Sequence, residues 1–272
     1  MNRRLALGFG LLVLLVASAG CLGFFDDSIS DEALDEEATY GWDEVPNWTV
    51  ENGTPTPVET NETTDVFVNV TGSSYHAVYH INNSSRDEFE VWTRGISNDN
   101  PVDISALRWR YPNGTTVNGS ELQVYKTNFR THIVFPDVGD GETVNGTLAF
   151  TGPTEPKTFR LWNHMEGSYE VVLPAGFRTE FFLFGQVVPA PDEKYVDDDN
   201  RVHLQWDEVT STITVKYYLE RDYYIFTGAF ALFSLVAIGG TAYYWSRIRE
   251  LTELREELGT GPDGGNGPPG EG

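Results

Sequence analysis

A run of carboxylates is the part of this sequence best suited to bind a metal ion. Asp197, Asp198 and Asp199 follow one another, shortly after Asp192 and Glu193. Carboxylate oxygens on a turn are ligands that Ca²⁺ accepts, but the run lacks the turn glycine and the distal glutamate of an EF-hand. We therefore expect a solvated acidic turn. Asp197, Asp198 and Asp199 stay as a weak metal candidate, and we predict no bound metal and no cofactor.

The histidines give no stronger signal for a metal site. His76 and His80 have the spacing of a helical zinc pair, but their segment alternates like a strand. On a strand they would lie ~13 Å apart, too far to share a zinc ion with bonds of about 2 Å. His132, His164 and His203 have no ligand-like spacing. The expected apolar face of the strand consists of Tyr75, Ala77, Tyr79 and Ile81.

Motifs for catalysis and nucleotide binding are absent from the sequence. It contains no nucleophile elbow, phosphate-binding loop or dinucleotide fingerprint. Four tryptophans on expected strands could line a sugar platform, but such residues more often fill a core. These are Trp92, Trp109, Trp162 and Trp206. We predict no catalytic residues and a protein that is not an enzyme.

Several residues have the context of covalent modification sites. Asn-x-Ser/Thr acceptors, which are short and individually weak patterns, occur in the first 150 residues. They are Asn47, Asn52, Asn61, Asn69, Asn82, Asn83, Asn113, Asn118 and Asn145. Sugars there would shield an exported chain from proteases, whereas Asn-Gly-Thr turns alone would explain part of the pattern.

The N-terminus, residues 1–21, has the three parts of an export signal. Arg3 and Arg4 precede an apolar stretch, and small residues then lead to Cys21. The small residues before Cys21 are similar to a lipobox, which predicts lipidation of Cys21. Ser18 stands where leucine is usual, so cleavage after Ala19 and retention as an anchor stay open. Cys21 is the single cysteine, so no disulfide is expected within the chain.

Charge and composition exclude one class of partner. The 272 residues carry a net charge of −23, with 41 acidic and 18 basic residues. This charge repels phosphate backbones, and no basic stripe occurs, so we predict no nucleic-acid binding. Heavy acidity is ordinarily a solvation device, and with so little lysine it is typical of proteins from salt-loving archaea.

The chain between the signal and residue 222 falls into two parts. Residues 22–64 are acidic and then rich in proline and threonine, which predicts a disordered, extended stalk in which Trp42 and Trp48 dock on the domain or on lipid. Residues 65–222 alternate with period two between turn signals; Val202, Leu204 and Trp206, for example, oppose His203 and Gln205.

We therefore predict a mainly β fold, an antiparallel β-sandwich formed as one large or two small units, with a possible division near residues 152–156. Phe181–Phe184 breaks the alternation. It is expected to be a strand buried on both faces or, alternatively, an exposed loop that touches lipid or a partner.

Residues 223–245 form an uncharged stretch with aromatic residues at both ends. As a helix it would be ~35 Å long, enough to cross a hydrocarbon core of about 30 Å. Arg247 and Arg249 follow, which predicts that residues 246–272 are cytoplasmic and that the N-terminal domain is extracellular. Ala237 and Thr241 would permit helix packing, so a homo-oligomer stays open.

The complete layout, from the lipobox-like signal through the acidic stalk and β domain to the C-terminal span, resembles uncharacterised haloarchaeal surface lipoproteins. The resemblance implies a membrane-anchored cell-surface protein and supplies no activity. The first hypothesis is a non-catalytic module for interaction with other envelope proteins or for envelope organisation. A ligand- or ion-binding sensor or accessory subunit that acts through a membrane partner is the alternative, and an extracytoplasmic hydrolase ranks last.

Overall fold

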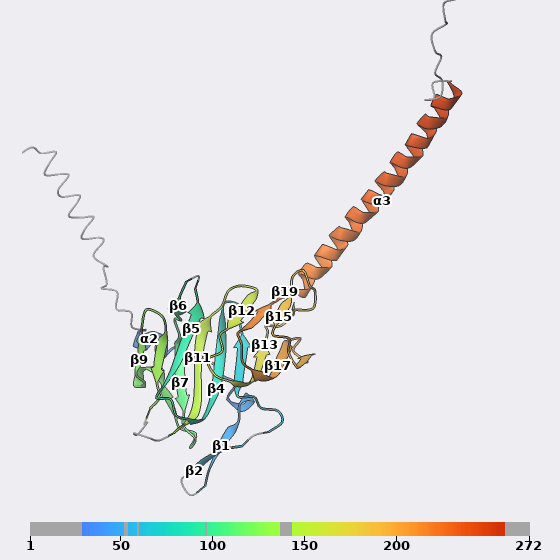
Figure 1. The fold of residues 1–272 in the computed structure, drawn as a ribbon. Coiled ribbons are helices and arrows are strands. Elements are labelled where there is room, and N and C mark those ends of the chain that lie inside the picture. The colour runs from blue at the N-terminus through green and yellow to red at the C-terminus, as the bar shows by residue number, and fades with distance from the viewer. Residues whose placement is uncertain (1–28, 52–53, 59, 96, 137–142, 259–272) are drawn as a thin grey trace, which may run out of the picture. The chain divides into compact units, whose positions relative to one another are not determined.

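The computed structural model describes residues 29–51, 54–58, 60–95, 97–136 and 143–258 (Figure 1). The described residues up to Tyr218 form one compact β-rich unit, and those from Leu219 onward form a second unit that consists of a helix. The predicted signal, Cys21 and the last residues of the tail lie outside the described residues.

An eight-stranded sheet runs through the first unit. Its strands, in spatial order, are β16 (Glu193–Val196), β17 (Val202–Val209), β13 (Gly167–Val172), β3 (Val66–Val70), β4 (Ser74–Ser84), β11 (Val144–Pro153), β7 (Ser105–Arg110) and β8 (Thr116–Asn118). Neighbouring strands are antiparallel except β3 and β13, which pair in parallel with Val66 opposite Tyr169.

Smaller sheets complete the unit. A four-stranded sheet contains β6 (Asp99–Pro101), β5 (Glu88–Arg94), β10 (Thr131–Val134) and β9 (Val124–Lys126). A three-stranded sheet contains β12 (Thr158–Leu161), β18 (Ile213–Lys216) and β15 (Gln186–Val188). Two pairs remain: β1 (Asn47–Glu51) with β2 (Thr54–Val58), and β14 (Phe177–Arg178) with β19 (Tyr218–Leu219). A short 3-10 turn, η2 (Gly119–Glu121), follows β8.

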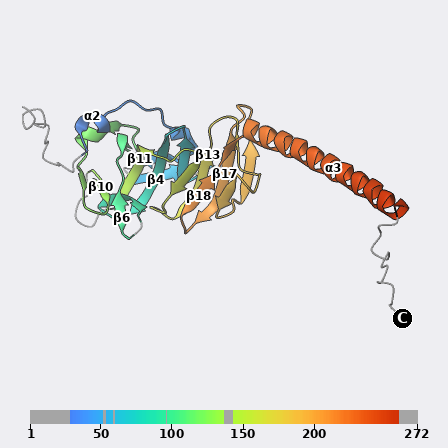
Figure 2. The ribbon, with the colours of Figure 1, turned by 90° about the horizontal axis from the view of Figure 1, so that it is seen from above.

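A single core joins the eight-stranded sheet to both smaller sheets. Tyr79 on β4 contacts Phe89 on β5 at a ring distance of 4.8 Å, and Tyr75 contacts Phe159 on β12 at 5.4 Å. Figure 2 shows β10 and β6 toward one end of this unit and β17 and β18 toward the other, with β4 and β11 between them. The prediction of a mainly β, sandwich-like fold is confirmed.

The sequence left open one large or two small β units, and the described residues show no division near residues 152–156. Strands on both sides of that position belong to the same eight-stranded sheet, and the boundary between units falls after Tyr218. The reason is the parallel pairing of β13 with β3, which ties the second half of the chain to the first.

The part of the predicted stalk that the structure describes is folded. It contains α2 (Asp31–Leu34) and η1 (Trp42–Glu44) before β1, and Leu34, Tyr40 and Val45 are buried. Tyr40 packs with Phe67, Val78 and Ala149 on the face of the eight-stranded sheet opposite the main core. The expectation of an extended stalk is therefore wrong for these residues. The buried side chains are isolated in the sequence and follow no periodic pattern, so the sequence gives no sign that they pack on the sheet.

Phe181–Phe184 form an exposed turn between β14 and β15, so the expectation of a strand buried on both faces is wrong. Gly185 explains the turn. Its amide donates to the Phe181 carbonyl at 2.7 Å, and a Cβ atom at this position would lie 2.2 Å from the Thr179 carbonyl oxygen. The tight reversal leaves only three residues, Gln186–Val188, to pair as β15.

The second unit is the helix α3 (Glu220–Glu257), which has 38 residues. Its apolar part has a mean hydropathy of 1.8, and by length and composition the helix could cross a membrane. It starts directly after β19, so no linker separates the last strand from the helix.

Candidate functional site

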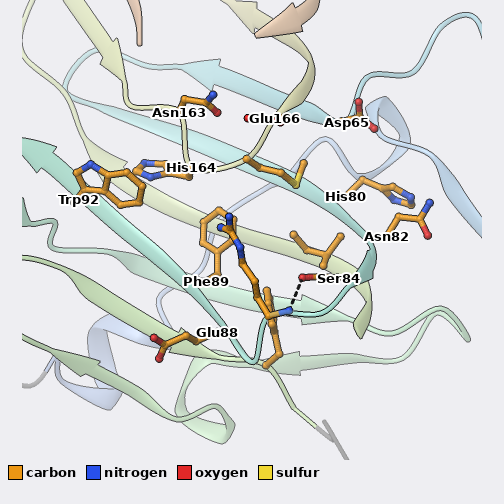
Figure 3. A pocket seen from close by; sticks show the side chains of 14 residues that line it. Asp65, His80, Asn82, Ser84, Glu88, Phe89, Trp92, Asn163, His164 and Glu166 are labelled. Carbon is orange, nitrogen blue, oxygen red and sulfur yellow. Dashed lines mark hydrogen bonds between the residues drawn. The ribbon is translucent and has the colours of Figure 1, made fainter. Parts of the chain in front are cut away.

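A cleft of about 520 Å³ lies at the edge of the four-stranded sheet (Figure 3). Its walls come from the end of β4, from β5 and from the loop between β12 and β13. The lining residues are Asp65, His80, Ile81, Asn82, Ser84, Arg86, Glu88, Phe89, Trp92, Phe135, Asn163, His164, Met165 and Glu166. Nine of these fourteen residues are polar or charged and five are apolar or aromatic, so the cleft is more polar than most small-molecule sites.

Hydrogen bonds hold the loop wall of the cleft in place. The Asn163 side chain donates to the Val209 carbonyl at 3.1 Å, and the Tyr169 hydroxyl donates to the Met165 carbonyl. Asp65 accepts from the Ser168 amide at 2.8 Å. These bonds join the loop to β13, to β17 and to the residue before β3, so the fold itself holds this wall of the cleft.

His164 is the most perturbed polar group of the cleft. It is buried against the edge of Trp92, with ring centroids 4.5 Å apart, and against Phe89 at 6.0 Å. Burial, assisted by the positive charge of Arg130, lowers the pKa of His164 to about 3. Its Nδ1 atom is buried and has no hydrogen-bond partner within the described part of the chain. An unsatisfied buried nitrogen costs about 1–3 kcal/mol, so the position of this ring lowers the stability of the fold.

His80 lies at the other side of the cleft, as Figure 3 shows. Trp48 from β1 stacks on its ring at a centroid distance of 4.5 Å. Burial lowers the pKa of His80 to about 4, and the nearby Asp65 carboxylate opposes this shift only in part. Both histidines are therefore neutral at pH 7, and the charged lining groups are Asp65, Glu88, Glu166 and the single cation Arg86.

Sequence reasoning missed this cleft because its walls come from segments far apart in the chain. His164 was noted only for its lack of ligand spacing. The one local signal is that Trp162-Asn163-His164-Met165 interrupts the alternating pattern between two strands.

One group in the described chain has donors close enough to hold a metal ion. Glu88 and Glu90 on β5 and His132 on β10 place one ligand atom each within 4.8 Å of one another. The group is already paired internally. His132 Nδ1 lies 3.0 Å from Glu88, the Tyr125 hydroxyl donates to Glu88 at 2.8 Å, and Arg130 forms an ion pair with Glu90. A metal ion would have to displace these contacts, so the cluster is best described as a surface ion-pair network.

Asp197, Asp198 and Asp199 do not form such a three-ligand group. Asp197 accepts from the Arg201 amide at 2.8 Å and lies 3.0 Å from His203 Nε2. Asp198 and Asp199 are exposed in the turn. The structure thus uses Asp197 as a hydrogen-bond acceptor that holds the turn between β16 and β17.

The other ring nitrogen of His203 faces a buried carboxylate. His203 Nδ1 lies 2.5 Å from Glu170, which also accepts from Gln205 at 3.0 Å. Burial alone would lower the pKa of His203, but the hydrogen bonds and charges of Glu170 and Asp197 outweigh it and raise the pKa. Burial likewise would raise the pKa of Glu170, yet the bonds from His203, Gln205 and Tyr195 lower it.

The other predicted candidates are spread over the domain. His76 and His80 lie on one strand, where His76 contacts the Thr39 carbonyl at 3.1 Å and forms no three-ligand group. Trp109 and Trp206 are buried in the core, while Trp92 and Trp162 are half-buried beside a smaller cavity that they share with His164. The four tryptophans therefore do not form one platform.

The described asparagine acceptors differ in exposure. Exposed side chains belong to Asn47, Asn61, Asn82, Asn83, Asn113 and Asn118. Asn69 and Asn145 are half-buried, and their side-chain oxygens accept from Arg201 and from the Asn83 amide. Asn52 and Cys21 lie outside the described residues.

Comparison with known proteins identifies the family of this chain. No curated protein matches the chain. A family of unknown function, DUF5803, matches residues 62–263. This range starts shortly before β3 and includes the strands from β3 to β19 and all of α3, whereas α2, η1, β1 and β2 precede it. Because the match covers most of the sequence, the chain belongs to the family DUF5803.

Proposed function

We propose that this protein is a non-catalytic, membrane-anchored surface module that binds a small ligand in the cleft at His164. The observation that carries the proposal is the cleft of about 520 Å³, whose loop wall is held by hydrogen bonds and whose lining combines aromatic with polar side chains. The ligand class follows from the lining. Phe89, Trp92 and Met165 favour an aromatic or aliphatic group, and Asp65, Glu88 and Glu166 favour a neutral or cationic ligand over an anionic one.

The membrane anchor in this proposal is α3. The helix is long and apolar enough to cross a bilayer, and Arg247 and Arg249 follow the uncharged stretch Tyr223–Trp245. Under the positive-inside rule the arginine end is cytoplasmic, so the β unit would stand outside the cell. The acidic composition supports a protein adapted to a high-salt environment. The same proposal includes a lipid on Cys21 and sugars on the exposed asparagines.

Binding is favoured over catalysis because His164 and His80 are both only weakly basic. An effective general base has a pKa near the working pH. The pKa values of about 3 for His164 and about 4 for His80 make both rings weak bases at neutral pH. They are better suited to give or accept a fixed hydrogen bond.

The test is a fragment screen by thermal unfolding of the full chain in detergent. Neutral and cationic aromatic fragments should raise Tm of the wild type, and anionic ones should not. The shift should vanish in W92A, which removes one wall of the cleft, and persist in F129A, which alters an exposed aromatic side chain outside the cleft. Equal shifts in W92A and wild type would place binding elsewhere and contradict the proposal.

A further inference from the structure

Three consecutive apolar side chains are exposed in the turn between β14 and β15. The exposed fraction is 80% for Phe182, 54% for Leu183 and 38% for Phe184. Single exposed apolar residues are normal, but a contiguous group is unusual on a soluble surface and marks a contact with lipid or protein.

The turn is held rigidly, so this exposure is built into the fold. Phe181 N donates to the Tyr218 hydroxyl at 3.2 Å, and the Phe184 amide donates to the Phe181 carbonyl at 2.9 Å. The rings of Phe181 and Phe184 pack 5.3 Å apart, and Phe184 lies 5.9 Å from the Tyr218 ring. The base of the turn is thus packed against Tyr218, while Phe182 and Leu183 point to its outer side.

The position of Tyr218, close in sequence to the apolar part of α3, favours lipid over protein as the partner of the exposed turn. Leu219 and Glu220, the first residue of α3, follow it directly, and the uncharged stretch of α3 begins at Tyr223. Five residues span at most ~18 Å at about 3.5 Å each. The rings of Phe181 and Phe182 lie 5.4 Å apart, and Phe181 lies 6.4 Å from Tyr218. The exposed tip is therefore within a short distance of the point where α3 would enter a bilayer.

The charges around the turn are compatible with a lipid surface. Glu180, the carboxylate next to the turn, is ion-paired with Lys194 at 2.6 Å, and Lys194 also donates to Thr179 at 2.7 Å. Lys216 is exposed on β18 opposite Gln186, and Lys157 is exposed at the start of β12. Three of the four lysines of this acidic chain thus lie on the segments that surround the turn.

We infer that the tip Phe182–Leu183 inserts into the outer lipid headgroup region as a second membrane contact of the domain. Apolar side chains gain free energy at this boundary, and the exposed Lys216, on the strand that pairs with β15, would face lipid phosphates. The contact would fix the orientation of the β unit on the bilayer. This inference rests on the part of the proposed function that makes α3 a membrane span.

The test uses the full chain in nanodiscs of phosphatidylcholine with a minor fraction of phosphatidylglycerol. In a C21S background, a single cysteine at position 183, 129 or 233 is labelled with the fluorophore NBD, and quenching by lipids that carry a nitroxide near the headgroup or deep in the acyl chain is measured. F233C in the middle of α3 should be quenched by the deep nitroxide. L183C should be quenched several-fold more strongly by the shallow nitroxide than F129C, which is exposed elsewhere on the domain.

The controls distinguish failure of the α3 membrane anchor from failure of the inferred insertion of Phe182–Leu183. Loss of quenching at F233C would contradict the membrane anchor itself. Normal quenching at F233C together with equal, weak quenching at L183C and F129C would overturn the inference and leave the anchor intact. A second variant, F182S with label at 183, should reduce the shallow quenching at unchanged Tm, because both side chains are exposed and contribute little to the core.

Discussion

At the scale of single residues, the buried histidines couple stability to pH. His164 and His80 have folded-state pKa values of about 3 and about 4, below the ordinary value of 6.5. The unfolded chain therefore binds more protons than the folded chain as pH falls below 6.5, and stability decreases in that range.

We predict that His164→Leu weakens this acid sensitivity. Each pKa unit corresponds to about 1.4 kcal/mol. Between pH 6.5 and pH 4.5 the wild type should therefore lose roughly 2–3 kcal/mol more free energy of unfolding than H164L. Urea unfolding of the full chain in detergent at both pH values measures this difference. The variant H76Q, which changes a histidine outside the cleft, should follow the wild type; a parallel loss in H164L would contradict the assigned pKa.

His203, which pairs with Glu170, contributes to stability with the opposite pH dependence from His164 and His80. The raised pKa of His203 means that its contribution is complete below the unfolded value of 6.5 and is lost as pH rises through the folded-state pKa. The lowered pKa of Glu170 means that its contribution is present above 4.5 and is lost as pH falls through its folded-state pKa.

His203→Gln should therefore cost most stability between about pH 4.5 and 6.5 and less at higher pH. Denaturant titrations of H203Q and wild type from pH 5 to pH 9 would show the difference between their free energies of unfolding shrinking as pH rises. A pH-independent difference would mean that the pair acts only by hydrogen bonding.

At the scale of elements, the segment from α2 to β1 acts as part of the fold. Leu34 is buried in the main core beside Leu107 and Gly119, and the Tyr40 hydroxyl donates to the Ala106 carbonyl at 2.5 Å. Arg108 donates to the carbonyls of Leu34, Asp35 and Glu36. The segment is joined to β7 by side-chain packing and by these bonds.

We predict that Leu34→Ala lowers the free energy of unfolding by about 2–4 kcal/mol, as expected for a cavity in a packed core. Val50→Ala, on an exposed position of β1, should change it by less than about 0.5 kcal/mol. Equilibrium unfolding of both variants in the full chain provides the comparison. An unchanged stability of L34A would mean that the segment is loosely attached.

Individual elements also explain what the sequence predicts and what it does not. The strand around Val202–Trp206 is predictable because its alternating burial leaves a period of two in the residues. The strand at Tyr75–Ile81 is predictable from its alternating residue types, although Ala77 to Ile81 are all buried in the structure. The segment with Leu34, Tyr40 and Val45 was not, because single anchors in an acidic stretch resemble a disordered composition. For Phe181–Phe184 the sequence favours a buried strand over an exposed loop because apolar content indicates burial; the structure has the exposed loop, and only Gly185 hints at the reversal.

At the scale of the whole molecule, the boundary between units falls at Tyr218 and Leu219. A C21S chain that ends at Tyr218 lacks both α3 and the proposed lipid site, and it should therefore remain folded and leave the membrane fraction, with Tm within a few degrees of the full chain. Differential centrifugation and calorimetry check the two parts of this expectation. Loss of folding would show that α3 contributes to the stability of the β unit.

The candidate site belongs to this scale too, since its lining comes from β4, β5 and the loop after β12. No local spacing relates His80, Trp92 and His164 in the sequence. The cleft forms where two sheets meet, so it can be recognised only once the three-dimensional arrangement of the strands is known.

The parallel pairing of β3 with β13 has a consequence for biogenesis. Asp65, next to β3, bonds to Ser168 on β13, and the two residues are 103 positions apart. Contacts of such large sequence separation form slowly, because a long loop must close before they contribute. Under the proposed export, the eight-stranded sheet would thus stay incomplete until β13 and β17 have crossed the membrane and paired with β3.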